Sequence, residues 1–389
     1  IGGPSMVRAS AKNYQDVTII VNPEEYSGIL LELKDNAGNT LPQTRKRLAK
    51  DAFAHTAEYD VLISNYLESK FDNQEILFPP VLRSILVKKN ELRYGENPHQ
   101  KASFYVNKDK KSGIGNINQL HGKELSYNNL MDLDAAWQCV KDFEKPTVAI
   151  IKHTNPCGSA TASNLHEAYK KAYATDPVSS FGSIIGLNKH VDEQTASEIN
   201  QTFVEAVIAP SYDQKALEIL ISKKNIRIIE MPVSTDNEKI ILRHVAGGYL
   251  LQTPNEVIIN KDDVSYPTKK KPTESELEDL IYGYNMIKHV KSNAIIIVKG
   301  NQLIGIGAGQ MSRVDSVKIA LDKAEGKTEG AIMASDAFFP FKDSVKEAYE
   351  NGIKAIIQPG GSIRDQESID FCNENGIAMV YTNLRHFKH

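Results

Sequence analysis

From about residue 85 onward, strand-like and helix-like patterns alternate along the chain. The apolar run KPTVAII (145–151) is followed by a segment with apolar or small residues at Leu165, Ala168 and Ala172, a helical spacing. The alternation continues to the C-terminus through the strand patterns SSFGSIIGL (179–187), AIMASD (331–336), IKAIIQ (353–358) and IAMVYT (377–382). Strands separated by helices of this length pair in parallel, so the sequence predicts an α/β fold built from βαβ units.

Shorter signals place several turns and helix ends. Gly300-Asn301 separates AIIIVK (294–299) from QLIGIG (302–307), which predicts a two-residue hairpin turn. Thr273 and Glu276 form a T-x-x-E capping box at the start of a helix. Further helices are predicted at 312–324, at 343–352 and at 363–376, the last two ended by glycine.

The first 75 residues look different from the rest. They hold a helix-like segment at 6–14, one strand-like run, VTIIV (17–21), and helical segments over 46–67. One strand cannot close a doubly wound sheet. We therefore expect the tail of a larger α/β domain whose beginning is absent from this sequence.

Composition excludes several classes of protein. With 389 residues and 41% hydrophobic content the chain is typical of a globular protein of two or three domains. A net charge of −3 gives no reason to expect a nucleic-acid partner, and no apolar run approaches the 18 residues of a membrane span. The odd cysteine count, Cys139, Cys157 and Cys372, argues against a disulfide framework, so we expect a reducing, cytoplasmic location.

Polar, glycine-rich and aromatic segments follow several predicted strands. Ligands of open α/β sheets bind beyond the carboxyl ends of strands, so these segments are the places to look for a site. They are KHTNPCG (152–158), SDAFFPFKD (335–343), PGGS (359–362) and NLRHFKH (383–389).

The first of these segments allows three kinds of chemistry. A zinc deaminase would need H-x-E followed by P-C-x-x-C, but the chain lacks H-x-E and has Ala160 where the second cysteine would stand. Cys157 could act as a nucleophile with His153 as its base, although a small buried thiol is the commoner role. The partial glycine motif GIGAG (305–309) is too short to predict a dinucleotide site.

The pair Lys152-His153 is the strongest chemical signal. An imidazole can accept a proton near neutral pH, and an adjacent ammonium can stabilise developing negative charge. Arg93, Arg313 and Arg385 lie in motif-like surroundings, and guanidinium groups suit phosphate or carboxylate ligands. Together they favour an enzyme acting on an anionic substrate, while a non-catalytic module that binds the same ligand is the alternative.

Eight segments resemble a known family, the bifunctional purine-biosynthesis enzymes that combine phosphoribosylaminoimidazolecarboxamide (AICAR) formyltransferase with IMP cyclohydrolase. They are LRYGENPHQ (92–100), IKHTNPCG (151–158), SSFG (179–182), SNAI (292–295), GIGAGQMSRVDS (305–316), SDAFFPFKD (335–343), QPGGSIRD (358–365) and TNLRHFKH (382–389). The resemblance implies transfer of a formyl group from 10-formyltetrahydrofolate to the 5-amino group of AICAR, without a metal. It also implies a homodimer with the active site at the subunit interface.

The resemblance assigns roles to individual residues. His153 is expected to accept the proton, Lys152 to stabilise the transition state, and Asn293 to contact the developing oxyanion. The residues expected to bind AICAR are Arg93, Tyr94, Asn129, Gly182, Glu205, Arg313, Phe338 and Arg385, with Glu205 standing where the family can have aspartate. The residues expected on the folate side are Val314, Asp343, Ser362 and Ile363.

The resemblance also implies a division of the chain. Residues 76–240 and 241–389 are expected to form two cytidine-deaminase-like three-layer α/β/α units. Residues 1–75 are expected to be the remnant of a methylglyoxal-synthase-like cyclohydrolase domain, with Lys12 at a position used in ring closure and Gly2 at the nucleotide loop. Because the earlier cyclohydrolase motifs are absent, we do not expect this chain to close the IMP ring efficiently.

Overall fold

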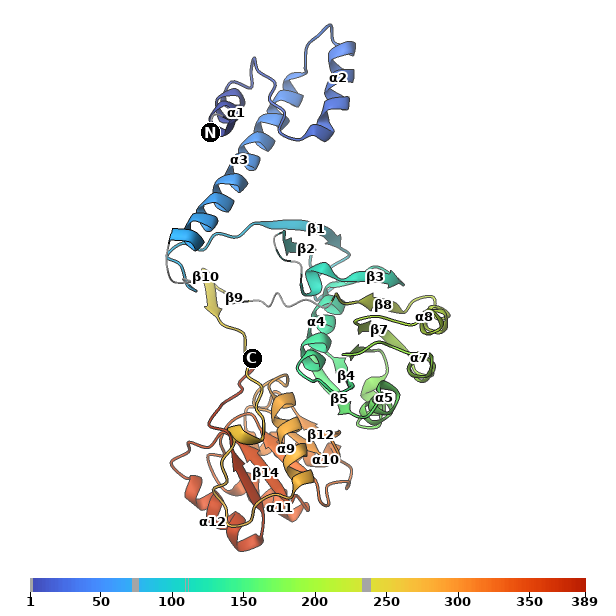
Figure 1. The fold of residues 1–389 in the computed structure, drawn as a ribbon, viewed down its shortest axis with the longest axis vertical. Coiled ribbons are helices and arrows are strands. Elements are labelled where there is room, and N and C mark those ends of the chain that lie inside the picture. The colour runs from blue at the N-terminus through green and yellow to red at the C-terminus, as the bar shows by residue number, and fades with distance from the viewer. Residues whose placement is uncertain (1–2, 72–76, 109, 111, 233–238) are drawn as a thin grey trace. The chain divides into compact units, whose positions relative to one another are not determined.

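A computed structural model describes residues 3–71, 77–108, 110, 112–232 and 239–389 (Figure 1). Contacts divide the chain into two compact units. The first consists of Ile1–Val87 and Lys239–Gln252, and the second of Lys88–Glu238 and Thr253–His389. Gly2, expected at the cyclohydrolase site, lies outside the described residues.

The first unit contains helices α1 (Gly3–Lys12), α2 (Tyr26–Asp35) and α3 (Pro42–Phe71), and a hairpin of β9 (Ile241–Val245) and β10 (Gly248–Gln252). The helices expected at 6–14 and 46–67 are confirmed, but the strand expected at 17–21 is wrong. That segment forms no strand in the described part of the chain, because Ile19 and Val21 pack against alanines of α1 and α3 rather than entering a sheet.

The second unit begins with a two-stranded sheet and a larger mixed sheet. The small sheet pairs β1 (Leu86–Leu92) with β2 (Ala102–Asn107). The larger sheet has the order β3-β8-β7-β6-β4-β5. Its strands are β3 (Asn118–His121), β4 (Thr147–Lys152), β5 (Asn155–Thr161), β6 (Ser183–Leu187), β7 (Val204–Ala209) and β8 (Arg227–Glu230).

Parallel pairing is only partly confirmed in this sheet. Strands β6, β7 and β8 are parallel, whereas β4 is antiparallel to both of its neighbours, β5 and β6. The reason is a hairpin that the sequence analysis missed. The chain turns back after β4 to form β5, so the parallel βαβ crossover joins β5 to β6 over β4.

Helices cover both faces of this sheet. Alternate residues of the strands belong to two different buried clusters, as expected when successive side chains point to opposite faces. Helix α4 (Tyr127–Lys141) packs on one face, and α5 (Leu165–Tyr173), α7 (Glu193–Ile199) and α8 (Gln214–Ile221) pack on the other. The short helix α6 (Pro177–Ser180) precedes β6.

A second sheet, of order β12-β11-β13-β14-β15, follows. Its strands are β11 (Ile295–Val298), β12 (Leu303–Gly307), β13 (Ile332–Ser335), β14 (Ala355–Gln358) and β15 (Ala378–Tyr381). The last three are parallel, as predicted. The predicted hairpin turn is also confirmed, because Gly300 and Asn301 have φ values of 62° and 54° between antiparallel β11 and β12.

The helices of the second half begin and end largely as the sequence predicted. They are α9 (Glu274–Ile287), α10 (Arg313–Lys323), α11 (Asp343–Glu350) and α12 (Asp365–Asn375). Thr273 and Glu276 form the expected capping box, and Gly376 ends α12 in a left-handed conformation. Helix α9 covers one face of the second sheet, and α10, α11 and α12 cover the other.

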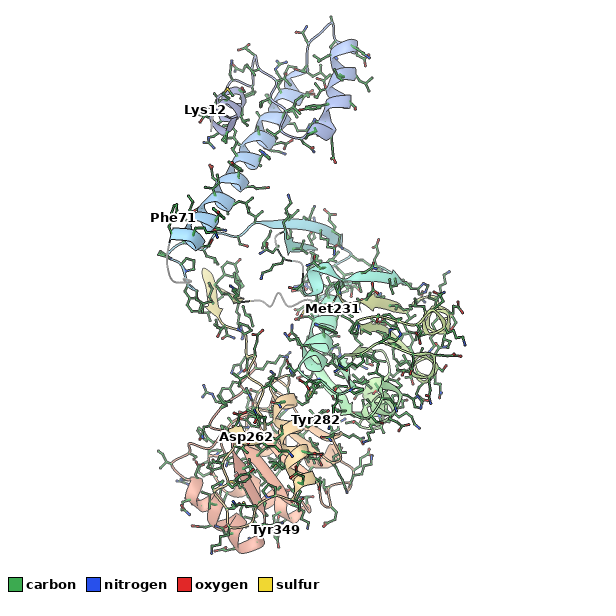
Figure 2. All side chains as sticks on the ribbon, viewed as in Figure 1. Lys12, Phe71, Met231, Asp262, Tyr282 and Tyr349 are labelled. Atoms are coloured by element: carbon green, nitrogen blue, oxygen red, sulfur yellow. The ribbon has the colours of Figure 1, made fainter. Side chains whose placement is uncertain are left out.

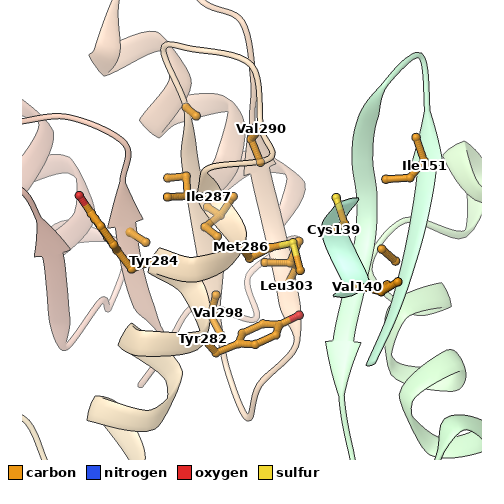
Figure 3. Close-up of a cluster of buried hydrophobic side chains, with 14 of the residues drawn as sticks. Cys139, Val140, Ile151, Tyr282, Tyr284, Met286, Ile287, Val290, Val298 and Leu303 are labelled. Carbon is orange, nitrogen blue, oxygen red and sulfur yellow. The ribbon is translucent and has the colours of Figure 1, made fainter. Parts of the chain in front are cut away.

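One buried cluster joins the two sheets through α4 and α9 (Figure 3). Cys139 and Val140 of α4 belong to the same buried cluster as Met286 of α9 and Leu303 of β12 (Figure 3). The sheet edges also meet, because the Thr161 N–H donates to the Asn301 carbonyl at 2.9 Å. The second unit is therefore a mixed α/β structure in which both sheets share a core.

Candidate functional site

Three expected site residues lie at one end of the first sheet. The register pairs Ile151 of β4 with Ile184 of β6, and Ser183 of β6 with Val204 of β7. Lys152, Gly182 and Glu205 therefore lie on adjacent strands at the same end of the sheet. Strand β4 has its carboxyl end there, but β6 and β7 have their amino ends there. The rule that ligands bind beyond the carboxyl ends of strands would therefore have located only Lys152.

Hydrogen bonds fix the side chains at this end of the sheet. The Lys152 ammonium donates to the Phe181 carbonyl at 2.7 Å, directly beside Gly182. Gly182 has a φ of 70°, which favours glycine at this position. Glu205 forms an ion pair with Arg227 at 2.6 Å. The sequence analysis did not identify Arg227, because no local sequence pattern predicts that the start of β8 lies beside Glu205.

His153 occupies a tight hairpin turn between β4 and β5. Lys152 pairs with Asn155 in the hairpin, so His153 and Thr154 are the only two loop residues. Both have left-handed backbones, with φ values of 52° and 62°. The His153 side chain is exposed at the end of the sheet, and Lys152 beside it is half-buried.

The turn is tied to the second half of the unit. The Asn155 side-chain oxygen accepts the backbone N–H of Lys291 at 3.0 Å. Asn293, a third residue of the expected catalytic set, lies two positions after Lys291 in the segment that precedes β11. The structure thus brings the Lys152-His153 hairpin and the Asn293 segment to the same region, although they belong to different sheets.

Arg93, Tyr94 and Asn129 lie around the beginning of α4. The Arg93 guanidinium lies 5.5 Å from the centre of the Tyr94 ring. The Asn128 side chain donates to the Glu96 carbonyl at 3.2 Å, which holds this loop beside α4. Asn129 already has a structural role, because its side-chain oxygen completes the capping box with Ser126.

A pocket of about 640 Å³ lies at the end of the second sheet, where the parallel strands have their carboxyl ends. Six of the expected site residues line it: Asn293, Arg313, Val314, Phe338, Asp343 and Arg385. Phe341 and Phe387 also line it, and both side chains are partly exposed there, at 50% and 40%. Exposed aromatic rings beside polar groups are typical of a site for a flat organic ligand.

Arg313 is held rigidly in the pocket wall. Its guanidinium donates to the buried carboxylate of Asp336 and, at 2.9 Å, to both the Ser335 hydroxyl and the Asn293 side-chain oxygen. The Asn293 amide in turn donates to the Gln310 and Met311 carbonyls at 3.0 and 3.1 Å. Arg313 and Asn293 therefore form one preorganised polar surface, in which Asp336 is a partner that the sequence analysis missed.

Two expected folate-side residues lie outside the pocket lining. Ser362 and Ile363 belong to the loop after β14, and the Ile363 side chain is fully exposed. The next residue, Arg364, stacks over the Phe341 ring with its guanidinium 4.8 Å from the ring centre. This contact places the loop at the edge of the pocket.

Lys12, expected at the cyclohydrolase site, is an exposed residue at the end of α1 in the first unit (Figure 2). Cys157 in β5 is half-buried, and its thiol donates to the Ile150 carbonyl at 3.4 Å. Burial raises the pKa of the Cys157 thiol to about 11, which opposes formation of a nucleophilic thiolate.

Among the residues that the structure describes, no group of three or more histidine, cysteine, aspartate or glutamate side chains is arranged to hold a metal ion. None of the helices whose structure is described combines the length and apolar character needed to cross a membrane.

Comparison with known proteins shows the family of the chain. The sequence profile of the AICARFT/IMPCHase bienzyme family matches residues 10–323. The bifunctional purine biosynthesis protein PurH of Acetivibrio thermocellus is 52% identical over 395 residues, covering all of this chain and 76% of the relative. The proteins of the same name from Ruminiclostridium cellulolyticum and Bacillus cytotoxicus are each 49% identical, with the same coverage. The chain therefore belongs to the AICARFT/IMPCHase bienzyme family.

Proposed function

We propose that His153 and Lys152 carry out the formyl transfer by which this AICAR formyltransferase acts in purine biosynthesis. The formyl donor is 10-formyltetrahydrofolate, the acceptor is the 5-amino group of AICAR, and the products are FAICAR and tetrahydrofolate. The observation that carries the proposal is the hydrogen bond between Asn155 and Lys291, which joins the His153 hairpin to the segment that leads into the pocket.

The chemistry requires a base, because the amine of AICAR is conjugated to its imidazole ring and is weakly nucleophilic. His153 removes the amine proton as nitrogen attacks the formyl carbon, and the Lys152 ammonium stabilises the oxyanion that forms. When this tetrahedral intermediate collapses, the bond from the formyl carbon to N10 of the folate breaks, and N10 takes the proton from His153 and leaves as tetrahydrofolate. We also assign to Asn293 a contact with this oxyanion. Both of its amide hydrogens are donated to carbonyls, so a contact with the oxyanion would require one of these bonds to be released.

The pocket supports a division between two substrates. Arg385 is exposed in the wall, where its guanidinium stacks on Phe387 at 4.3 Å, and such a group can bind a phosphate. We assign Arg93, Tyr94, Arg313 and Phe338 to AICAR as well. Val314 and Asp343, with Ser362 and Ile363 at the pocket edge, are assigned to the folate.

We further propose a cytoplasmic homodimer whose subunits complete each other's active sites. Large apolar side chains of the first unit are exposed, among them Tyr66 and Phe71 of α3 and Tyr249 and Leu250 of the β9–β10 hairpin. An isolated two-stranded hairpin is marginally stable, so a partner surface would stabilise it. We also propose that the two halves of the second unit are cytidine-deaminase-like, and that residues 1–75 are part of a cyclohydrolase domain.

The test is AICAR-dependent formation of tetrahydrofolate from 10-formyltetrahydrofolate. His153→Ala should lower kcat by about 10²–10⁴-fold, the usual contribution of a general base, while AICAR binding stays measurable. The control is His190→Ala, since His190 is an exposed histidine paired with Asp213, and we expect its kcat to stay within about twofold of wild type. A near-normal kcat for His153→Ala would refute the role of His153. Binding of both substrates by the wild type without product would favour the non-catalytic module.

A further inference from the structure

The turn that carries His153 is one that its own sequence disfavours. Two-residue hairpin loops with both residues left-handed usually contain asparagine, aspartate or glycine. Here the two positions hold His153 and Thr154, with φ values of 52° and 62°. Threonine is β-branched, and a β-branched residue with positive φ is a genuine outlier. Such a conformation persists only where surrounding groups enforce it.

Asp132 of α4 supplies that enforcement from one side. Its carboxylate accepts the backbone N–H of Thr154 at 2.7 Å. The carboxyl group is half-buried, and burial raises its pKa, while hydrogen bonds from the Thr154 and His153 backbones and the nearby His153 and Lys291 charges act in the opposite direction. The ionised carboxylate is therefore engaged mainly with the two residues of the turn.

On the other side, the turn is held by side chains at its own ends. The Thr154 hydroxyl donates to the His153 carbonyl at 2.7 Å, and Asn155 binds the Lys291 backbone. Neither contact reaches the Thr154 N–H. Asp132 is thus the group that binds the loop amide directly, and it does so from a helix that begins beside Arg93 and Tyr94.

We propose that Asp132 is a positioning residue for formyl transfer: its carboxylate holds the left-handed His153-Thr154 turn, and so fixes the backbone from which the His153 imidazole reaches the amine. This inference rests on the proposed role of His153. It differs from that role because Asp132 touches neither substrate and acts only through the turn.

Four variants separate this idea from a general loss of stability. Asp132→Ala should lower kcat on the order of 10- to 100-fold, the effect of losing one hydrogen bond to a charged group, with the KM for AICAR within about threefold of wild type. Asp132→Asn keeps an oxygen acceptor and should stay within about threefold in kcat. Thr154→Gly, which adopts positive φ without strain, should be close to wild type. The double variant D132A/T154G should regain at least half of the logarithmic loss.

Melting temperature and AICAR binding are measured for every variant. Loss of kcat with an intact melting transition, together with rescue by Thr154→Gly, supports the proposal. An unchanged kcat for Asp132→Ala, no rescue in the double variant, or a loss of turnover that follows the loss of folded protein overturns it. If His153→Ala itself keeps full activity, the proposed function fails instead, so the two failures are distinguishable.

Discussion

The junction between the two sheets contains a buried ion cluster whose removal should be costly. Asp142, at the end of α4, accepts from the Lys288 ammonium at 2.9 Å and from the His289 ring at 2.7 Å, both at the end of α9. The Asp142, Lys288 and His289 side chains are only 10%, 2% and 9% exposed. Asp142→Ala would leave the ammonium with the Asn255 and Val257 carbonyls at 3.3 Å and no carboxylate.

Breaking a buried pair by removing one partner typically costs about 3–5 kcal/mol, because the remaining charge is left uncompensated. We expect a loss of that size in the free energy of unfolding of Asp142→Ala. Urea unfolding can be followed by the fluorescence of Trp137, the single tryptophan of the chain, which packs against the shared core from α4.

The control removes an exposed ion pair. Lys215 and Glu193 are 3.1 Å apart, with side chains 73% and 56% exposed, and Lys215→Ala should cost about 0–1 kcal/mol. If Asp142→Ala lost less than about 1 kcal/mol, the cluster would contribute no more than a surface pair. The reasoning about a shared, water-excluded junction would then be wrong.

The same cluster predicts how stability depends on pH. Burial, with help from Lys388 and Lys288, lowers the pKa of His289 from 6.5 to about 4. In the unfolded chain this ring takes up a proton near 6.5, while in the folded chain it stays neutral until about pH 4. The urea midpoint should therefore fall as the pH is lowered through this window. Burial acts to raise the pKa of Asp142, but His289 and Lys288 hold that pKa below its usual value. The contribution of the Asp142 carboxylate to stability is therefore lost only in stronger acid. A urea midpoint that rises as the pH is lowered from 6.5 toward about 4 would contradict this account.

Two further pairs of substitutions test packing and substrate assignment. Gly158→Ala would put a methyl group 2.1 Å from the Ala172 carbonyl oxygen, so we expect the free energy of unfolding to fall on the order of 3 kcal/mol. Gly248→Ala is the control and should change stability little, because a methyl group there meets nothing within 4 Å. Equal melting temperatures for the two variants would refute the packing argument. Arg385→Ala should raise the KM for AICAR on the order of 10- to 100-fold and affect the folate KM less. Phe341→Ala should do the reverse, because the Phe341 ring packs against Arg364, next to the proposed folate residues Ser362 and Ile363. The opposite split in steady-state kinetics would contradict both assignments.

The features predicted best are those with local chemical causes. Gly376 ends α12, Gly300-Asn301 turns a hairpin, and Thr273 begins α9, each because the backbone there needs that residue type. Phe338, Asp343 and Arg385 could also be located, because they follow the parallel strands β13 and β15. In these places local propensity and the tertiary fold favour the same structure. Asn293, Arg313 and Val314, which also line the pocket, were expected only from the family resemblance.

The missed features depend on contacts between distant segments. Strand β5 contains Asn155, Pro156 and Gly158, which disfavour strands, and it forms because β4 pairs with it. Its proline is tolerated because β5 lies at the edge of the sheet and the register shifts beside it. Asp132 gave no signal either, because nothing in the α4 pattern shows that a hairpin 22 residues away needs an acceptor.

Helix α9 decides how this chain could be divided or recombined. Every residue from Tyr282 to Ile287 is buried, so this stretch of the helix has no solvent-exposed face. A C-terminal half produced alone would expose an apolar flank, and one grafted onto a foreign N-terminal half would need a surface shaped to receive it. The two sheet-containing halves therefore cannot be exchanged independently between related proteins. A chimaera that folds would have to take α4 and α9 from the same parent.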